Sequence, residues 1–103
     1  MILHSVYLAL RADADPAELA DVMQSLAALV GQIDGFAGFA HGPNRDLEGK
    51  SPDAPYGFVC TFDDVTALAA YAADPRHTAL GTRLVDLCGG ADGIMVYDLD
   101  VGA

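Results

Sequence analysis

Two segments of this chain alternate as β-strands do and yet carry apolar side chains on both faces. In residues 2–10, one face holds Ile2, His4, Val6, Leu8 and Leu10, and the other holds Leu3, Ser5, Tyr7 and Ala9. In residues 56–62, one face holds Tyr56, Phe58, Cys60 and Phe62, and the other holds Gly57, Val59 and Thr61. An antiparallel sheet with helices on one side and water on the other normally shows polar residues to the water. These strands therefore predict a sheet that is covered on both faces.

The segment after the first strand has the start signals of a helix. Asp15 suits the N-cap, Pro16 the first helical position and Glu18 the third. The apolar residues that follow at helical spacing are Leu19, Val22, Met23, Leu26, Val30 and Ile33. They predict one buried stripe. Gly31 is the expected C-cap, and a short strand is expected over residues 36–41.

The second half of the chain repeats this order with a broken helix. The first part begins at Asp63 or Asp64. Its apolar residues are Val65, Leu68, Ala69 and Ala72. Pro75 lacks an N–H and crowds the preceding turn, so this helix must stop before it. Asp74 as N-cap and Pro75 at the first position then begin a second helix. Its buried residues are expected to be Leu80, Leu84 and Leu87. The last strand is expected over residues 94–101.

The resulting order is strand, helix, strand, strand, broken helix, strand. It predicts one ferredoxin-like α+β domain over residues 1–103, a split β-α-β fold with a four-stranded antiparallel sheet and helices on one face. A second copy is the simplest cover for the other face, because a two-fold interface needs only one self-complementary patch. We therefore expect a homodimeric α/β barrel formed through the sheet face. The polar loop of residues 42–54 either covers a binding site or is a tolerated insertion.

The charge of the chain limits the kinds of molecule that it can bind. Fifteen acidic against five basic side chains give a net charge of −10, which repels nucleic acids and anionic lipid headgroups. No apolar run approaches the roughly 20 residues that a membrane span requires. Residues 1–4 lead directly into the first strand, without the features of a signal peptide. We expect no nucleic-acid or membrane partner and a cytoplasmic location.

Cofactor motifs are missing from the sequence. It has no Gly-rich phosphate loop, no nucleophile elbow and no dinucleotide fingerprint. Cys60 and Cys88 have apolar neighbours and no C-x-x-C spacing, which predicts two buried free thiols. His4, His41 and His77 lie on three distant segments without a short ligand spacing. We expect neither a metal nor an organic cofactor.

The stretch from Tyr71 to His77 places a phenol, a helix break and an imidazole in one corner. His77 is the third residue after the Asp74 N-cap. The helix end favours its neutral form and Asp74 its charged form, so the direction of its pKa shift stays open. A neutral His77 could take a proton next to a carbonyl while the Tyr71 hydroxyl donates to the developing enolate. The alternative is structural, with Tyr71 packed on its helix, its hydroxyl in water and His77 on the surface.

His4 shares a strand face with Ile2 and Val6, so we expect it to be buried with a hydrogen-bond partner, in the core or in a pocket. Asp98, in the last strand, either orients a histidine across the sheet or caps a backbone group. His4, Tyr71 and His77 are together the candidate residues of a small apolar pocket between the sheet and the helices.

A set of spaced features extends over almost the whole chain: His4; Asp34, Gly35 and Phe36; Gly42 and Asn44; Phe62, Leu68 and Tyr71; Pro75 and His77; and Asp98. With these features the sequence resembles the stress-responsive dimeric A/B barrel (Dabb) family. The resemblance implies a ferredoxin-like subunit whose sheet pairs with that of a partner to close a barrel. One plant member is a polyketide aldol cyclase that uses no metal or organic cofactor. Tyr71 and His77 match its functional tyrosine and histidine, and His4 matches a further pocket histidine. The family commonly has His-Pro-x-His where this chain has Asp74-Pro75-Arg76-His77.

Three functions remain open from the sequence. The first is a homodimeric barrel protein that binds a small hydrophobic ligand, with His4 as a ligand-binding residue. The second is a cofactor-free cyclase, lyase or isomerase with Tyr71 and His77 as its catalytic acid/base pair. The third is a non-catalytic dimeric interaction module with a filled interior.

Overall fold

The computed structural model describes residues 1–102 of the chain. Within this range it has four strands, β1 (Ile2–Leu8), β2 (Phe36–Pro43), β3 (Tyr56–Phe62) and β4 (Ile94–Asp100). The three α-helices of this range are α1 (Pro16–Ala27), α2 (Val65–Ala73) and α3 (Pro75–Leu87), and a short 3-10 helix, η1 (Ala91–Gly93), precedes β4. The order of the elements is the one that the sequence predicts. No helix in residues 1–102 has the length and apolar character needed to cross a membrane.

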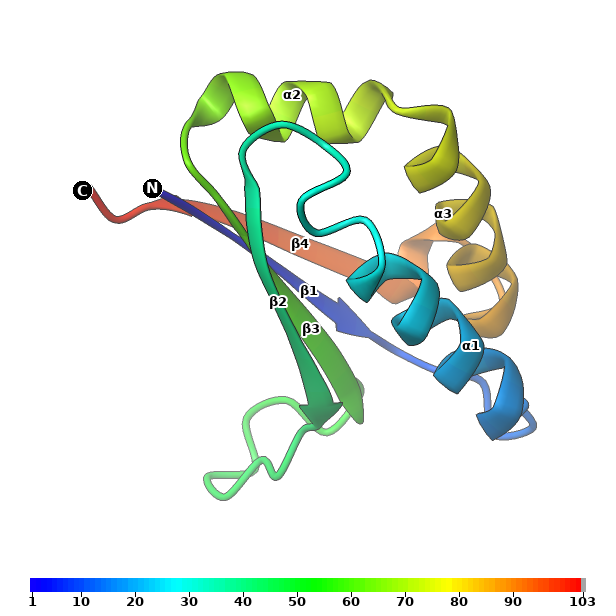
Figure 1. Cartoon of the computed structure of the whole chain (residues 1–103). Coiled ribbons are helices and arrows are strands. Elements are labelled where there is room, and N and C mark those ends of the chain that lie inside the picture. The colour runs from blue at the N-terminus through cyan, green and yellow to red at the C-terminus, as the bar shows by residue number, and fades with distance from the viewer. Residues whose placement is uncertain (103) are drawn as a thin grey trace.

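The strands form one antiparallel sheet in the order β2-β3-β1-β4. The helices α1, α2 and α3 lie on one side of this sheet, and no described helix covers its other side (Figure 1). The fold is therefore the expected ferredoxin-like arrangement, with one layer of helices on one layer of strands.

An aspartate caps the start of each α-helix, as the sequence indicates. The Oδ1 atoms of Asp15, Asp64 and Asp74 each accept a hydrogen bond from a backbone amide two or three residues later, at 2.8 to 2.9 Å. Pro16 and Pro75 occupy first helical positions, where a missing N–H costs nothing. The helices α2 and α3 are thus separate and meet at Asp74.

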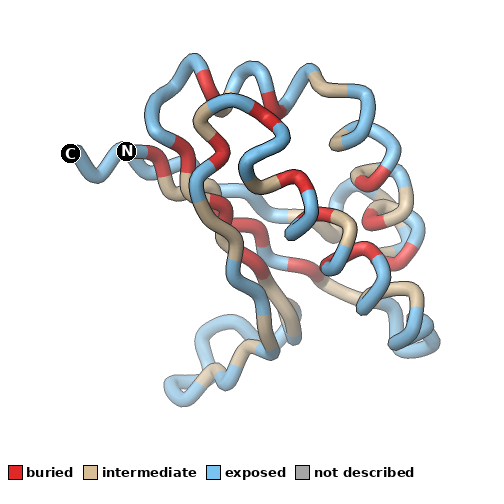
Figure 2. The backbone as a smooth tube through the Cα atoms, viewed as in Figure 1, coloured by how far each residue is buried: buried red, intermediate tan, exposed pale blue. Residues whose placement is uncertain are grey.

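The hydrophobic core lies between the sheet and the helices. Its largest fully buried side chains are Tyr71, Phe36, Phe62, Leu8, Met23, Leu26, Val22 and Cys60. Figure 2 shows the buried positions concentrated between the strands and the helix turns that face them. Both cysteines are free, and Cys60 is buried as expected. Cys88 is only partly buried, which corrects the prediction, because it is the C-cap residue at the end of α3.

Three strand ends differ from the sequence prediction. β1 ends at Leu8 rather than at residue 10, because the next backbone amide bonds to the carbonyl of Gly93. β2 continues beyond residue 41 to Pro43, because its pairing with β3 extends that far. β4 ends at Asp100, one residue earlier than expected. The polar loop between β2 and β3 therefore covers residues 44–55.

The helix α1 is also shorter than predicted. It ends at Ala27, and Gly31, with a φ of +78°, lies in the turns that follow. The amide of Gly31 donates to the carbonyl of Phe36 at 3.1 Å, so this glycine joins the turn to the start of β2 instead of capping the helix. Val30 and Ile33 still pack against the core, from the turn rather than from the helix.

The uncovered face of the sheet changes in side-chain size from one edge to the other. Strand pairing aligns three rows across it: Gly38, Thr61, Leu3 and Leu99; Ala40, Val59, Ser5 and Tyr97; and Gly42, Gly57, Tyr7 and Met95. Each row begins with Gly or Ala on β2 and ends with a large apolar residue on β4. Met95, Tyr97 and Leu99 are 55%, 53% and 56% exposed. An apolar ridge on β4 thus lies across the face from a trough of small residues on β2.

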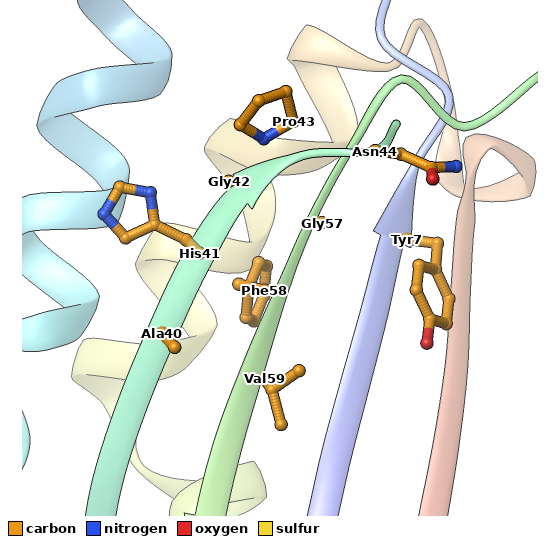
Figure 3. A pocket seen from close by; sticks show the side chains of 9 residues that line it. All are labelled: Tyr7, Ala40, His41, Gly42, Pro43, Asn44, Gly57, Phe58 and Val59. Atoms are coloured by element: carbon orange, nitrogen blue, oxygen red, sulfur yellow. The ribbon is translucent and has the colours of Figure 1, made fainter. Parts of the chain in front are cut away.

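A hollow of about 290 Å³ lies where this trough meets the end of β2, and Figure 3 shows the side chains around it. Its lining residues are Tyr7, Ala40, His41, Gly42, Pro43, Asn44, Gly57, Phe58 and Val59. The ring of His41 projects from β2 toward α1, away from Tyr7. His41 therefore belongs to the helix side of the sheet rather than to the trough.

The two ends of the described chain lie side by side (Figure 1). The amino group of Met1 donates to the carbonyl of Gly102 at 2.8 Å, and the amide of Val101 donates to the carbonyl of Met1 at 3.0 Å. These bonds continue the β1–β4 pair, at the opposite end of the strands from the loop of residues 44–55.

Candidate functional site

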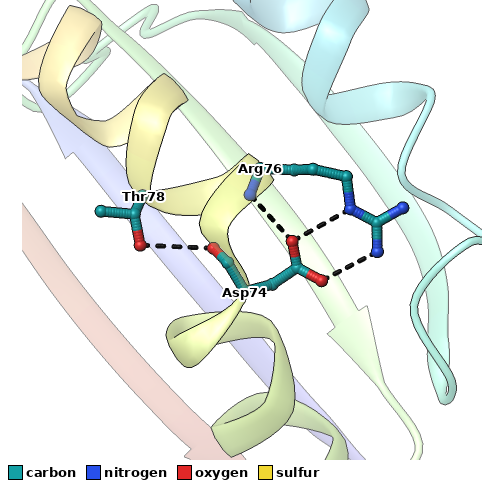
Figure 4. Close-up of polar contacts among 3 residues, drawn as sticks. All are labelled: Asp74, Arg76 and Thr78. Carbon is teal, nitrogen blue, oxygen red and sulfur yellow. Dashed lines mark hydrogen bonds and ion pairs between the residues drawn. The ribbon is translucent and has the colours of Figure 1, made fainter.

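The corner between α2 and α3 is fixed by Asp74 (Figure 4). Its Oδ1 accepts hydrogen bonds from the backbone amide of Arg76 at 2.8 Å and from Nε of the same residue at 3.0 Å. Its Oδ2 accepts from Nη2 of Arg76 at 2.8 Å, and its backbone carbonyl accepts from the Thr78 hydroxyl at 3.2 Å. The Arg76 side chain, followed by the Arg76 amide, lowers the pKa of Asp74 to about 2. Asp74 stands where the resembled family commonly has a histidine, and its carboxylate is therefore occupied by hydrogen bonds at the start of α3.

This corner brings Tyr71 against His77. Their ring centroids are 4.1 Å apart, with 39° between the ring planes. Tyr71 is 1% exposed, and Sγ of Cys60 donates a weak hydrogen bond to its hydroxyl at 3.9 Å. Burial raises the pKa of Tyr71 above its usual value, and the neighbouring Cys60 acts in the same direction. The hydroxyl is thus inside the protein rather than in water, and it stays protonated at neutral pH.

His77 is half-buried, and its Nδ1 atom is buried without a hydrogen-bond partner among the described residues. Burial lowers the pKa of His77. The Ala72 carbonyl opposes this shift, His4 adds to it and Asp74 opposes it. The direction that the sequence left open is therefore downward. The neutral imidazole, which can accept a proton, is favoured at neutral pH.

His4 is oriented by a carboxylate on the neighbouring strand. Its Nδ1 lies 2.5 Å from Oδ1 of Asp98, the residue opposite it on β4. The side chain of His4 is only 12% exposed. When Nδ1–H donates to the carboxylate, the neutral imidazole keeps its free lone pair on Nε2. The expectation of a largely buried His4 with a partner is confirmed, and of the two roles considered for Asp98 the structure shows the orienting one.

A cleft of about 430 Å³ between the sheet and α3 joins the two histidines. Its lining residues are His4, Val6, Phe58, His77, Thr78, Gly81, Thr82, Leu84, Val85, Ile94 and Val96. Tyr71 does not line it, although its ring centroid lies 5.6 Å from that of His4 and 4.1 Å from that of His77. The structure thus brings the three candidate residues into one cluster, and it opens two of them to the cleft.

The wall of this cleft on α3 was missed by the sequence analysis. One face of the helix carries His77, Thr78, Gly81, Thr82 and Val85, because they follow one another at alternating spacings of one and three residues. Gly81 leaves nothing within 4 Å of the point where a Cβ would stand. The available signal was a glycine in a helix interior, where it lowers stability unless space is needed, four residues after a candidate histidine.

The cleft suits an uncharged ligand better than a charged one. Its lining contains no Lys, Arg, Asp or Glu, so a buried charge would have no counter-charge beside it. Within residues 1–102, no group of three His, Cys, Asp or Glu side chains is placed to hold a metal ion. What the arrangement offers is an apolar volume with two imidazoles and two threonine hydroxyls at its surface.

The single helical layer, the bare apolar sheet face and the histidine-lined cleft define a small ferredoxin-like α+β protein with a ligand-sized cleft. The chain belongs to the stress responsive A/B barrel domain family, whose model matches residues 2–101. The family resemblance identified in the sequence is therefore confirmed.

Several solved structures share this fold. A dimeric ferredoxin-like protein of unknown function from Jannaschia sp. CCS1 is 44% identical, with a TM-score of 0.91 over 97% of this chain and 98% of that chain. The protein At3g17210 from Arabidopsis thaliana is 22% identical, with a TM-score of 0.83 over 100% and 97% of the two chains. A hydroxynitrile lyase from Passiflora edulis is 11% identical, with a TM-score of 0.78 over 99% and 95%. The last two similarities show the fold alone. A comparison with curated proteins finds no significant match.

Proposed function

We propose that this protein binds a small, uncharged and mainly apolar ligand in the cleft between the sheet and α3. The observation that carries this proposal is the cleft itself, about 430 Å³ in volume, with apolar walls and the imidazoles of His4 and His77. Ligand sites typically have volumes of about 300–1,000 Å³ and mostly apolar linings with a few placed polar groups. In this function His4, held by Asp98, and His77 orient a polar group of the ligand.

N-phenyl-1-naphthylamine, an uncharged probe that fluoresces in apolar surroundings, tests the proposal. Gly81→Phe places a ring in the cleft from a position with room for a Cβ, so it is expected to remove binding there. Gly81→Ala is the matched control and is expected to bind. Amide NMR shifts of residues 77–85 locate the probe, and unfolding curves check that both variants fold.

The ligand proposal fails if the wild-type protein shows no saturable binding with shifts at residues 77–85. It also fails if the Gly81→Phe variant shows the same shifts as the Gly81→Ala variant. Absence of binding would favour the non-catalytic interaction module over a ligand-binding role for the dimer.

We propose further that two copies of the chain pair through the uncovered face of the sheet. Met95, Tyr97 and Leu99 leave this face apolar, and apolar patches of this kind mark protein interfaces. The Jannaschia protein, which is 44% identical over 97% of this chain, is described as dimeric, and this supports the same assembly here.

The gradient of side-chain size indicates how the two sheets meet. A two-fold axis parallel to the strands exchanges the sheet edges, so that β4 of one subunit faces β2 of the other. An axis across the strands instead places β4 on β4 and β2 on β2. The first arrangement places the large side chains of β4 over Gly38, Ala40 and Gly42 on β2 of the partner. The second arrangement places the large side chains of the two β4 strands on each other and leaves a gap between the small residues of the two β2 strands. Close packing favours the first arrangement.

Cysteine variants distinguish the two arrangements. Ala40 and Tyr97 lie in one row of the sheet, so the axis parallel to the strands brings them opposite each other. In a Cys88→Ser background, the Ala40→Cys/Tyr97→Cys protein is expected to form disulfide-linked dimers on mild oxidation, while neither single variant does. Cross-linking of Tyr97→Cys alone would show the other axis. A monomeric mass for the wild-type protein in solution would contradict the dimer itself.

A second function is favoured by the neutral imidazole of His77, which lines the cleft and lies against the ring of Tyr71. It is a cofactor-free cyclase, lyase or isomerase in which Tyr71 and His77 act as an acid/base pair. Neutral His77 takes a proton from the carbon next to a carbonyl, and the Tyr71 hydroxyl donates a hydrogen bond to the enolate oxygen. This role requires the Tyr71 hydroxyl, which is buried and does not line the cleft, to turn from its 3.9 Å contact with Cys60 toward the cleft and the enolate. Nε2 of His4, when this nitrogen carries a proton, can donate a further hydrogen bond to the carbonyl oxygen of the ligand.

Exchange of the methyl protons of acetophenone in D₂O tests the catalytic function. The wild-type protein is expected to accelerate exchange, and His77→Gln and Tyr71→Phe are each expected to lower the rate by roughly 100-fold. Thr82→Val alters the same cleft without removing an acid or a base, so it serves as the control. Exchange no faster than in buffer, or equal rates in the wild type and His77→Gln, would exclude this pair while leaving the ligand proposal to its own test.

A further inference from the structure

We infer that a second ligand site lies between α1 and the β2 edge of the sheet, and that it binds an uncharged aromatic molecule bearing a hydrogen-bond acceptor such as a ketone. The site is a cleft of about 680 Å³, larger than the cleft of about 430 Å³ at His4 and His77. Residues of α1 between Pro16 and Ala27 line one side, and His41 and Tyr56 line the other. The two clefts share no lining residue, so filling one leaves the other open.

A polar pair stands on the sheet side of this second cleft. Nδ1 of His41 lies 2.6 Å from the hydroxyl oxygen of Tyr56. Because a neutral phenol is the stronger donor and an imidazole nitrogen the stronger acceptor, we assign this bond as Tyr56 donating to Nδ1, which leaves the imidazole proton on Nε2. That N–H is a free donor at an exposed position, and Figure 3 shows the His41 ring directed toward α1. An acceptor on the ligand is therefore the matching group.

The rings of His41 and Tyr56 form an aromatic platform next to this donor, and Phe39, which is not part of the lining, packs beside His41. The centroid of the His41 ring lies 6.0 Å from that of Tyr56 and 5.6 Å from that of Phe39, with 34° between the planes in each pair. Aromatic molecules pack on such rings in offset or edge-to-face geometry. Opposite the platform, Ala20 and Ala27 are exposed and small, which leaves room for a flat molecule.

Charge restricts the ligand further. No charged side chain lines the second cleft, while the chain as a whole carries a net charge of −10. An anion would be repelled without meeting a counter-charge, and a cation would find no carboxylate in the lining. Gln24 adds an amide on the α1 side. The site lies on the helix side of the sheet, so a dimer formed through the other face leaves it accessible.

Prodan, an uncharged naphthalene ketone whose emission reports apolar surroundings, tests this inference. Titrations use the Gly81→Phe protein, in which the first cleft is filled. We expect saturable binding that is lost in Ala20→Phe, because the new ring occupies the second cleft. Ala17→Phe, at an exposed position of the same helix outside the cleft, is the matched control and should bind as before. His41→Phe keeps the ring and removes the donor, so the Kd is expected to rise about fivefold to tenfold.

Circular dichroism checks each variant, and Ala27→Phe provides a second blocking substitution if Ala20→Phe does not fold. Amide NMR shifts on α1 and at residues 39–43, with little change at residues 77–85, would support the assignment. Three results would overturn it: no saturable binding, equal affinity in the blocking variant and in Ala17→Phe, or an unchanged Kd in His41→Phe. Each of them leaves the test of the first cleft unaffected.

Discussion

Gly81 lies in the interior of α3, where the absence of a side chain lowers helix stability. Nothing lies within 4 Å of a Cβ built at this position, and its φ is not in the positive range. Glycine in a helix interior is about 0.5–1 kcal/mol less favourable than alanine. Because the new methyl group would meet no neighbour, it would add neither a clash nor much buried area. We therefore predict that Gly81→Ala raises the free energy of unfolding by about 0.5–1 kcal/mol.

Thermal unfolding followed by far-UV circular dichroism measures this gain. For a domain of this size, 1 kcal/mol shifts the Tm by about 4–8 °C, so a rise of about 2–8 °C is expected. The proteins must be compared at one concentration, because the apparent stability of a dimer depends on it. Ala79→Gly, at an exposed position of the same helix, is the control and should lower the Tm by a similar amount.

The double variant Gly81→Ala/Ala79→Gly should then melt close to the wild type. An unchanged or lower Tm for Gly81→Ala, together with the normal decrease for Ala79→Gly, would refute the reasoning. It would show that the space beside Gly81 is occupied in the folded protein, and that the glycine is required for packing rather than for an open cleft.

Three further predictions concern the corner and the turn before β2. Gly35 has a φ of +80°, and a Cβ at this position would lie 2.5 Å from the Cβ of Ala67. Gly35→Ala should therefore lower the free energy of unfolding, measured with urea, by roughly 2 kcal/mol. An unchanged free energy of unfolding would contradict this prediction. Tyr71→Phe removes only a hydroxyl whose contact is a sulfur atom at 3.9 Å, so its free energy of unfolding should stay within about 1 kcal/mol of the wild-type value. Tyr71→Ala also removes the buried ring and should lower the free energy of unfolding by about 3–5 kcal/mol. Equal losses in the two variants would show that the hydroxyl, not the ring, carries the stability. The folded pKa of Asp74, about 2, is below its ordinary value of 3.8, so its stabilising effect is present above about pH 4 and is lost as the pH falls toward 2. The stability difference between wild type and Asp74→Asn should therefore shrink over that interval, and a constant difference would argue against the Arg76 contact as its cause.

Local signals allowed most of the fold to be predicted. The Asp-Pro pairs at residues 15–16 and 74–75 set two helix starts without reference to the rest of the chain, because capping and the fixed φ of proline act within one turn. The length of α1 was not predictable in this way. Val30 and Ile33 continue the apolar spacing, but the backbone has already left the helix and bonds to Phe36.

The buried face of α2 was also beyond the sequence pattern. The apolar residues noted there include Val65, but Val65 is 61% exposed, and Ala67 and Tyr71 are the buried residues. This helix of nine residues is rich in alanine and apolar on all sides, so periodicity cannot select one face. The sheet and the turn at Gly35 make that selection.

The candidate site could also be predicted only in part from the sequence. Residue types alone drew attention to His4, Tyr71 and His77. The contact of Asp98 with His4 depends on the register between β1 and β4, which joins residues 94 positions apart. The pairing of His41 with Tyr56 likewise depends on the β2–β3 register. Register arises from contacts between distant segments, so a single sequence without such contacts could suggest these partners only as alternatives or not at all.

The contact between the chain ends has a consequence for protein engineering. Because Met1 bonds to both Val101 and Gly102, a short linker could join the termini without moving β1 or β4. New ends could then be opened in the exposed loop of residues 44–55, which lines neither the cleft at His77 nor the one at His41. In such a circular permutant β1 and β4 would become a local hairpin. Retention of both clefts in this permutant would show that their geometry is independent of the order in which the elements follow along the chain.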